Sequence, residues 1–270
     1  MSALQAIVLG VVQGLTEFLP ISSTAHLRIV PDALGWDDPG AAFTAVIQLG
    51  TAAAVVVHFA PDLARIVRAW FKGLREPAVR RTLDARLGWY IVLGTVPISV
   101  AGLAFQGSIE TGARNRALIA VALIVGGGVL WLAERRGRRV RSLDSLQARD
   151  GLLVGLAQTA ALVPGVSRSG ATISAGLFLG LERVAAARYS FLLSIPSVVL
   201  SGLFEMGDIT GSGGASAGAT LVATGLAFVT GYASISFLLR LLATSSTLVF
   251  VVYRMALGAL VLALLAAGAL

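Results

Sequence analysis

The sequence predicts an all-α integral membrane protein with six transmembrane helices and two re-entrant, broken-helix hairpins, arranged as an inverted-topology repeat. Of its 270 residues, 56% are hydrophobic and 13% are charged, and the mean hydropathy is +0.85. Soluble domains are about 45–50% apolar and about 25% charged, so this composition indicates a chain whose main solvent is lipid. The other two observations are long apolar runs and shorter runs that stop at prolines.

Six apolar runs are long enough to cross a bilayer. A hydrocarbon core about 30 Å thick requires about 20 helical residues. We therefore expect transmembrane helices at 41–60, 87–106, 117–133, 187–206, 216–239 and 248–268.

Two further apolar runs end early at a proline. They cover 3–19 and 151–163, and at 1.5 Å per residue they reach only about 20–25 Å. Each is followed by a Ser/Thr-rich bend and a second apolar piece, at 25–30 and 170–180. Non-helical backbone at that depth must be buried in protein or line a polar cavity. Each pattern therefore predicts a hairpin of two half-helices that returns to its own side.

The basic residues gather on one side of the predicted membrane. The loops at 61–86 and 134–150 hold thirteen of the 21 Lys and Arg residues, and six crossings place both loops on one face. By the positive-inside rule that face is cytoplasmic. The loops at 31–40, 107–116 and 207–215 are mainly acidic, so both termini are expected on the non-cytoplasmic side. The net charge of +7 thus reflects topology, and no aromatic-interleaved basic stretch indicates a nucleic acid partner.

The two halves of the chain share a weak internal similarity. Gly10–Gln13 matches Gly155–Gln158, and one gap later Pro20–Ser23 matches Pro164–Ser167. Each half has a hairpin and three spans, and because three is odd the second copy must be inverted. The tips then meet near the midplane, where inverted repeats with broken helices place their binding site. The alternative is two unrelated polar kinks. We divide the single membrane domain, 1–270, into a first repeat at 1–133, a cytoplasmic basic linker at 134–150 and a second repeat at 151–270.

The first hairpin carries the motif QGLTEFLPISSTAH, from Gln13 to His26. Gln13 and Glu17 are four residues apart and share one helix face. Ser and Thr side chains after the proline can cap the second half-helix. The candidates for this cap are Ser22, Ser23 and Thr24. The motif gathers a carboxylate, an amide, hydroxyls and an imidazole in one pocket.

The second hairpin carries the motif PGVSRSGAT, from Pro164 to Thr172. It supplies another capped half-helix start and the guanidinium of Arg168. Helix amino termini present unpaired N–H groups and positive dipole, which favour anions and phosphates in particular. We therefore expect Ser167, Ser169 and Thr172 to bind substrate, together with Gln13, Ser22 and Thr24 of the first motif.

Charged residues at this depth require compensation. An Arg or Asp at the centre of a spanning helix costs about 2.5–3.5 kcal/mol, so intramembrane Glu17 and Arg168 imply a partner or a ligand. A mutual salt bridge would satisfy both, although it would not require the hydroxyls or His26. Arg254, inside the last span beside Tyr253, could either line the same cavity or extend to the interface.

These groups suit phosphoryl transfer. The reaction needs Arg and N–H donors for the charge on the equatorial oxygens, and a nucleophile in line. Glu17 could activate Ser23 or bind a divalent cation, and His26 could move the proton or be the nucleophile itself. The chain has no Cys nucleophile and no glycine-rich nucleotide motif. A lipid phosphate is therefore the expected ligand, and the sequence leaves Ser23 and His26 unranked as nucleophile.

The two motifs, with Val46–Gly50 between them, closely resemble the bacterial undecaprenyl-pyrophosphate phosphatase family of the bacitracin-resistance type, over essentially the whole chain. The resemblance implies a plasma-membrane hydrolase that removes the terminal phosphate of undecaprenyl pyrophosphate at the outer face, recycling the lipid carrier for cell-wall synthesis. It also implies that Glu17, His26 and Arg168 are central catalytic residues. Ser23, Ser167 and Thr172 would lie around the phosphates. A divalent cation, magnesium or calcium, is expected on Glu17.

Two positions depart from the family pattern. Gln13 stands where the family often has Glu, which leaves Glu17 as the one obvious acidic ligand for a cation, and Ala25 replaces a usual Gly. The main rival function is a lipid flippase or anion transporter, because inverted repeats and broken helices are also transporter features. The density of catalytic side-chain types in the first motif favours the enzyme.

Overall fold

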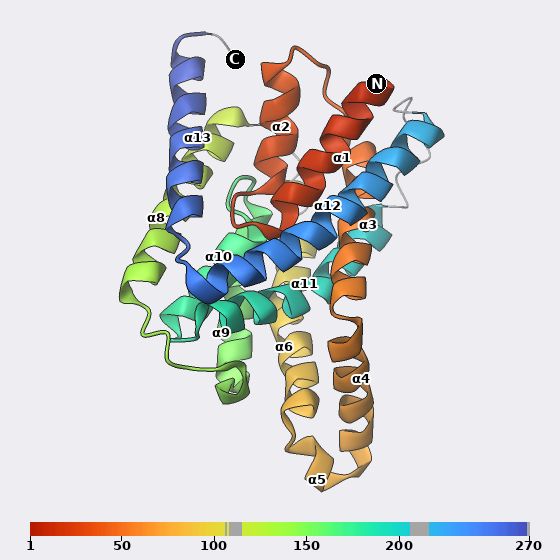
Figure 1. The fold of residues 1–270 in the computed structure, drawn as a ribbon, viewed down its shortest axis with the longest axis vertical. Coiled ribbons are helices and arrows are strands. Elements are labelled where there is room, and N and C mark those ends of the chain that lie inside the picture. Colours follow the sequence, from red (N-terminus) through yellow and green to blue (C-terminus); the bar gives the residue numbers. More distant parts are fainter. Residues whose placement is uncertain (106, 108–114, 206–215, 269–270) are drawn as a thin grey trace.

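The computed structural model describes residues 1–105, 107, 115–205 and 216–268 (Figure 1). Within these residues the chain forms helices joined by short loops and contains no β-sheet, which confirms the predicted all-α class. The helices are α1 (Ala3–Phe18), α2 (Ser23–Ala33), α3 (Ala41–His58), α4 (Ala60–Arg75), α5 (Pro77–Arg80), α6 (Leu83–Ala104), α8 (Arg116–Arg136), α9 (Ala148–Thr159), α10 (Arg168–Phe178), α11 (Arg183–Glu205), α12 (Ala217–Thr244) and α13 (Leu248–Ala266), with short 3-10 turns at Leu143–Ser145 and Ala160–Leu162.

The described part of the chain contains five helices that are long and apolar enough to cross a membrane, namely α6, α8, α11, α12 and α13. A sixth span is obtained if α3 and α4 are counted together, although their axes are bent by 73° at the break between them. The predicted span at 41–60 therefore ends at His58. Pro61 lies in the first turn of α4, where its missing N–H costs no hydrogen bond, so a new helix begins there.

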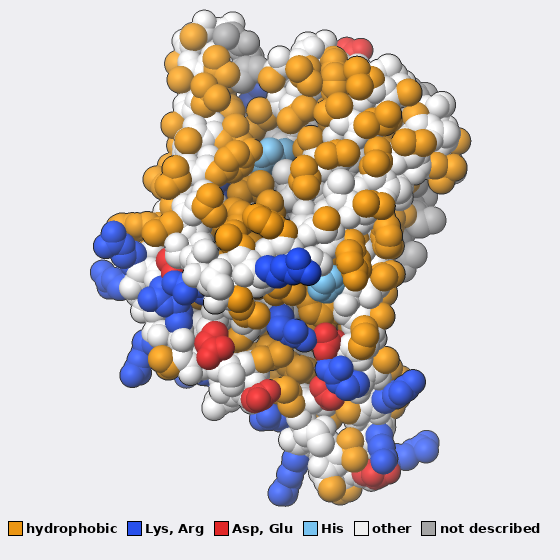
Figure 2. Space-filling view, viewed as in Figure 1, with side chains coloured by type: hydrophobic (Ala, Val, Ile, Leu, Met, Phe, Trp, Pro, Cys, Tyr) orange, Lys and Arg blue, Asp and Glu red, His pale blue; other side chains and the backbone are white. Residues whose placement is uncertain are grey.

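The basic loops differ from the prediction in structure but not in position. Most of 61–86 is helical as α4 and α5, with Asp62 in the first turn of α4 and Lys72 and Arg75 in its last turn, as the helix dipole favours. Arg86 donates to the backbone oxygen of Asp144 at 3.3 Å, which joins the two basic loops. Figure 2 shows Lys and Arg gathered over the lower part of the molecule and hydrophobic side chains over the upper part. The predicted acidic loops at 107–116 and 207–215 lie mostly outside the described residues.

Both proline motifs break a helix as predicted. α1 ends at Phe18 and α2 begins after the N-cap Ser22, whose side chain accepts from the N–H of Ala25. The second hairpin repeats this with Ser167, which accepts from the N–H of Gly170. Both serines have positive φ, +73° and +71°, a region that non-glycine residues rarely adopt. The two N-caps make Ser22 the equivalent of Ser167. The sequence match pairs Ser23 with Ser167, so the structural equivalence differs from it by one residue at this point.

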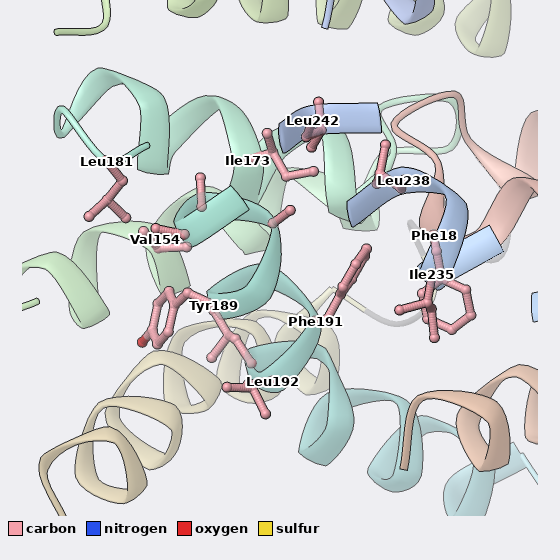
Figure 3. Packing of buried hydrophobic residues seen from close by; sticks show 14 of the residues in the cluster. Phe18, Val154, Ile173, Leu181, Tyr189, Phe191, Leu192, Ile235, Leu238 and Leu242 are labelled. Atoms are coloured by element: carbon pink, nitrogen blue, oxygen red, sulfur yellow. The ribbon is translucent and has the colours of Figure 1, made fainter. Parts of the chain in front are cut away.

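The hydrophobic core lies against the tips of both hairpins. Phe18, at the end of α1, meets Phe191 of α11 edge to face, with ring centroids 5.5 Å apart. Figure 3 shows residues of α11 in the midst of a cluster that also draws on α1, α9, α10 and α12. Its labelled members are Phe18, Val154, Ile173, Leu181, Tyr189, Phe191, Leu192, Ile235, Leu238 and Leu242. Because α11 packs beside both tips, the apolar core fixes where the polar motifs lie.

Candidate active site

A buried carboxylate joins the two hairpins. Glu17, near the end of α1, forms an ion pair with Arg168 at the start of α10, and these side chains are 6% and 16% exposed. The carboxylate also accepts from Ser23 Oγ at 2.6 Å and from Gln13 Nε2 at 3.1 Å. Three segments that the sequence predicts to come together therefore do meet, and four of the predicted site residues form one hydrogen-bonded cluster.

The ion pair satisfies Glu17 more fully than it satisfies Arg168. A carboxylate accepts at two oxygens, and three side chains donate to those of Glu17. A guanidinium carries five N–H donors, and among the described residues Arg168 donates to Glu17 alone. The remaining donors of Arg168 are therefore available to a phosphate. The salt bridge considered from sequence is present, and it leaves capacity to bind an anion.

Ser169 and Arg254 hold the two half-helix starts together by donating hydrogen bonds to backbone oxygens of the broken segments. Ser169 Oγ, on α10, donates to the backbone oxygen of Leu19 at 3.0 Å. Arg254, which is 0% exposed, donates to the oxygen of Pro20 in one tip and to those of Gly165 and Val166 in the other. Helix starts leave their first N–H groups without an intrahelical partner. The geometry thus brings two sets of such donors to one place.

His26 has a defined hydrogen-bond arrangement on both ring nitrogens. Its Nδ1 lies 2.7 Å from the backbone oxygen of Ser22, and its Nε2 lies 2.6 Å from the hydroxyl of Tyr253. A carbonyl oxygen can only accept, so Nδ1 carries the proton and, in the neutral ring, Nε2 has the lone pair. The ring of Tyr253 lies nearly parallel to the imidazole, with centroids 5.6 Å apart. Nε2 is therefore the nitrogen of His26 that can act in catalysis.

Comparison with known proteins gives the same assignment as the motifs. The family model described as bacitracin resistance protein BacA matches residues 6–260. The chain belongs to the BacA family. It is 52% identical over 270 residues to a protein named undecaprenyl-diphosphatase from Thermobifida fusca, covering 100% of this chain and 92% of that protein. A protein of the same name from Mycolicibacterium smegmatis is 55% identical over 274 residues, covering 100% of this chain and 99% of the relative.

Several hydroxyls that the sequence assigns to substrate binding in this BacA-family chain make hydrogen bonds within the protein. Thr172, which is almost fully buried, bonds through Oγ1 to the backbone oxygen of Arg168 at 2.8 Å and to Ser190 Oγ at 2.6 Å. It therefore holds α10 against α11. Ser22 and Ser167 act as N-caps, and Thr24 is exposed. Of the predicted hydroxyls, Ser23 is the one bonded to the Glu17 carboxylate.

Three residues of this BacA-family site come from outside the two motifs. Thr51 of α3 lies 3.4 Å from Gln13 Nε2, and Tyr253 and Arg254 come from α13. The full burial of Arg254 decides between the two alternatives left open by the sequence, because a snorkelling side chain would reach the interface. A polar Tyr-Arg pair inside the last apolar span is the one signal in the sequence that could have identified the α13 residues.

The side chains fit a divalent cation only if the substrate supplies further ligands. Among the described residues no group of three or more His, Cys, Asp or Glu side chains is arranged to hold a metal. Glu17 is the one carboxylate in the cluster, and Gln13 turns its amide nitrogen, which cannot bind a cation, toward it. Magnesium commonly binds one or two carboxylates together with substrate phosphates. Glu17 with the two phosphates of a pyrophosphate would match that pattern.

Proposed function

We propose that this chain hydrolyses undecaprenyl pyrophosphate to undecaprenyl phosphate and inorganic phosphate, recycles the lipid carrier for cell-wall synthesis and thereby confers resistance to bacitracin. The observation that carries the proposal is the cluster of Glu17, Ser23 and Arg168 at the meeting point of two capped half-helices. The names of its close relatives in the BacA family support the same reaction. A site at membrane depth suits a substrate whose polyprenyl chain stays in the lipid.

The hydrogen bonds favour Ser23 as the nucleophile. Its Oγ lies 2.6 Å from Glu17, which takes the hydroxyl proton as Oγ attacks the terminal phosphorus. The bond from that phosphorus to the bridging oxygen breaks, and undecaprenyl phosphate leaves. Arg168 and the helix N–H groups stabilise the charge on the equatorial oxygens.

Hydrolysis of the phosphoserine would complete the cycle. Water attacks its phosphorus and gives a proton to Nε2 of His26, while Ser23 Oγ leaves and takes back the proton from Glu17. His26 then returns its proton to the phosphate product, so all groups regain their starting state. A divalent cation on Glu17 and the substrate phosphates would add charge neutralisation when bound.

A phosphate-release assay on the purified protein in detergent tests the reaction and the cation together. We expect release from undecaprenyl pyrophosphate, its loss on treatment with a chelator, and its recovery on adding magnesium or calcium. Phosphate release that persists in the chelator would overturn the requirement for a divalent cation but not the proposed hydrolase activity. If no phosphate is released while labelled lipid crosses liposomes containing the protein, the function is transport.

We further propose that the site opens toward the outer face of the bacterial plasma membrane. The two joined basic loops would be cytoplasmic, with both termini on the other side. The chain has no Cys, so single cysteines report sidedness cleanly. In spheroplasts, a Ser2→Cys variant should react with a membrane-impermeant maleimide, and an Arg138→Cys variant should react only after permeabilisation. The reverse labelling pattern would place the site on the cytoplasmic side.

A further inference from the structure

The two hairpins differ in how their second half-helices are covered. In the second half of the chain, α10 packs closely along α8 and α11. In the predicted repeat, α2 corresponds to α10, and α13 and α3 correspond to α8 and α11. However, α2 has few backbone contacts with α13 or α3, and packs mainly on α1. Backbone packing therefore closes the α10 side of the site but leaves the seam between α2 and α13 to side chains.

Within the described residues, one polar side-chain pair bridges the seam, beside Leu257 of α13, which packs against the apolar cluster that contains Ala25 of α2. His26 on α2 is buried and bonds through Nε2 to the hydroxyl of Tyr253 on α13. Tyr253 is 44% exposed, and Val249 and Val252 before it on this lipid-facing helix are also exposed. The phenol ring thus extends from the outer surface of the helix bundle to the reactive nitrogen of the imidazole. A lipid headgroup entering between α2 and α13 from that surface would meet this ring.

The hydrogen bond occupies the atom that the reaction needs. Nδ1 of His26 is bonded to the backbone oxygen of Ser22, so Nε2 alone can take a proton from water. The hydroxyl of Tyr253 must donate to Nε2 in this arrangement, because in the neutral ring Nδ1 carries the proton and Nε2 has only a lone pair. As long as that bond is intact, neither water nor phosphate can use Nε2. Catalysis therefore requires the phenol to move.

We propose that Tyr253 is a positioning residue that holds Nε2 of His26 at rest, closes the lipid-facing seam between α2 and α13, and is displaced when the phosphate headgroup enters there. The inference rests on the proposed function for its substrate. The hydrogen bond and the parallel rings of Tyr253 and His26 are features of the structure and do not depend on which reaction the protein catalyses. Substrate binding then includes the cost of breaking one hydrogen bond, and the imidazole is shielded until the headgroup arrives.

The chain allows a clean test because it has two histidines, and His58 lies outside the site. In a His58→Gln background, His26 is the sole imidazole. We expect Tyr253→Phe to raise the rate at which diethyl pyrocarbonate modifies His26 several-fold, measured by mass spectrometry of the peptide. We also expect a shift of the ¹⁵N resonance of Nε2. The KM for undecaprenyl pyrophosphate should fall by about two- to tenfold, the worth of one hydrogen bond, with little change in kcat.

Tyr232→Phe is the matched control, because Tyr232 on α12 is similarly exposed and its ring contacts His58 rather than His26. It should leave all three measurements unchanged. Tyr253→Leu, which also removes the ring, should raise the modification of His26 at least as much as Tyr253→Phe. Unchanged modification and an unchanged ¹⁵N shift in both variants would overturn the proposal. A fall in kcat at constant KM would also overturn it, since the hydroxyl would then act in the chemical step. Modification and resonance need no turnover, so they test Tyr253 even if the proposed reaction is wrong.

Discussion

Replacing Arg168 with alanine is expected to lower kcat/KM for phosphate release by about 10³-fold or more, the range found when one arginine is lost from a phosphoryl-transfer site. Arg168 is the guanidinium at the tip of the second hairpin, and its donors beyond the Glu17 pair are those that can reach the phosphate. The measurement is the initial rate of phosphate release in detergent across substrate concentrations. His26→Ala should abolish release as well.

Arg168→Lys and a double variant separate catalysis from folding. Lysine keeps the charge but lacks the planar fork, so it should recover only part of the activity. If the pair were only structural, Glu17→Gln with Arg168→Ala would remove both charges and restore both stability and release. Arg188→Ala is the matched control, because Arg188 pairs with Asp62 outside the site. Normal release from a stable Arg168→Ala variant would remove Arg168 from the mechanism.

The sequence predicts the parts of the site that depend on local patterns. A proline at the end of a short apolar run, followed by serines that can cap a new helix, favours a break, so the breaks after Phe18 and before Ser167 were predictable. Pro97 and Pro196 lack such a Ser/Thr-rich bend after them and lie inside α6 and α11. Helical spacing places Gln13 beside Glu17, and their hydrogen bond confirms it. The costly charges Glu17 and Arg168 predicted that each has a partner or a ligand, and the ion pair between them was one of the alternatives; the structure contains that pair, across 151 residues.

Residues contributed by distant packing were not predictable in the same way. Tyr253 lies 227 residues from His26, and nothing in an apolar last span indicates which helix it will face. Arg254 binds backbone oxygens of both tips, and such acceptors leave no trace in side-chain patterns. The bend between α3 and α4 falls just before Pro61, and α4 then packs against α6, a contact that a hydropathy profile does not record.

The two hairpins have the same backbone arrangement at their N-caps but carry different functional side chains. With Ser22 and Ser167 as equivalent N-caps, Ser23 in the first hairpin corresponds to Arg168 in the second, one residue after the cap in each. The same helix start therefore presents a hydroxyl, the proposed nucleophile, in one hairpin and a guanidinium in the other. An inverted repeat, as the sequence predicts, would bring these two positions face to face, which a single hairpin could not do. The carboxylate of Glu17 lies between them and binds both.

The second large effect is expected at Glu134, on the side of the basic loops. Its carboxylate is about 5% exposed and accepts from Arg139 and Arg183. It also accepts from the backbone N–H and the hydroxyl of Thr247, at 3.3 and 2.9 Å, just before α13 begins. The carboxylate therefore connects the end of α8 to α11 and to the start of the helix that carries Tyr253 and Arg254.

Glu134→Ala is expected to lower the free energy of unfolding by about 1–3 kcal/mol, because it leaves the buried N–H and hydroxyl of Thr247 without their acceptor. The guanidinium groups of Arg139 and Arg183 are about a third exposed, so water compensates them in part. Denaturation by sodium dodecyl sulfate in mixed micelles measures that free energy. Glu76→Ala is the control, since Glu76 and Lys72 are both more than half exposed and such pairs contribute about 0–1 kcal/mol. Equal stability of the two variants would contradict the role of Glu134. Glu134 also holds the start of α13, so its loss should weaken the contact between Tyr253 and His26 in the protein that remains folded. We therefore expect Glu134→Ala to increase the modification of His26 by diethyl pyrocarbonate, although no residue of the site itself is changed.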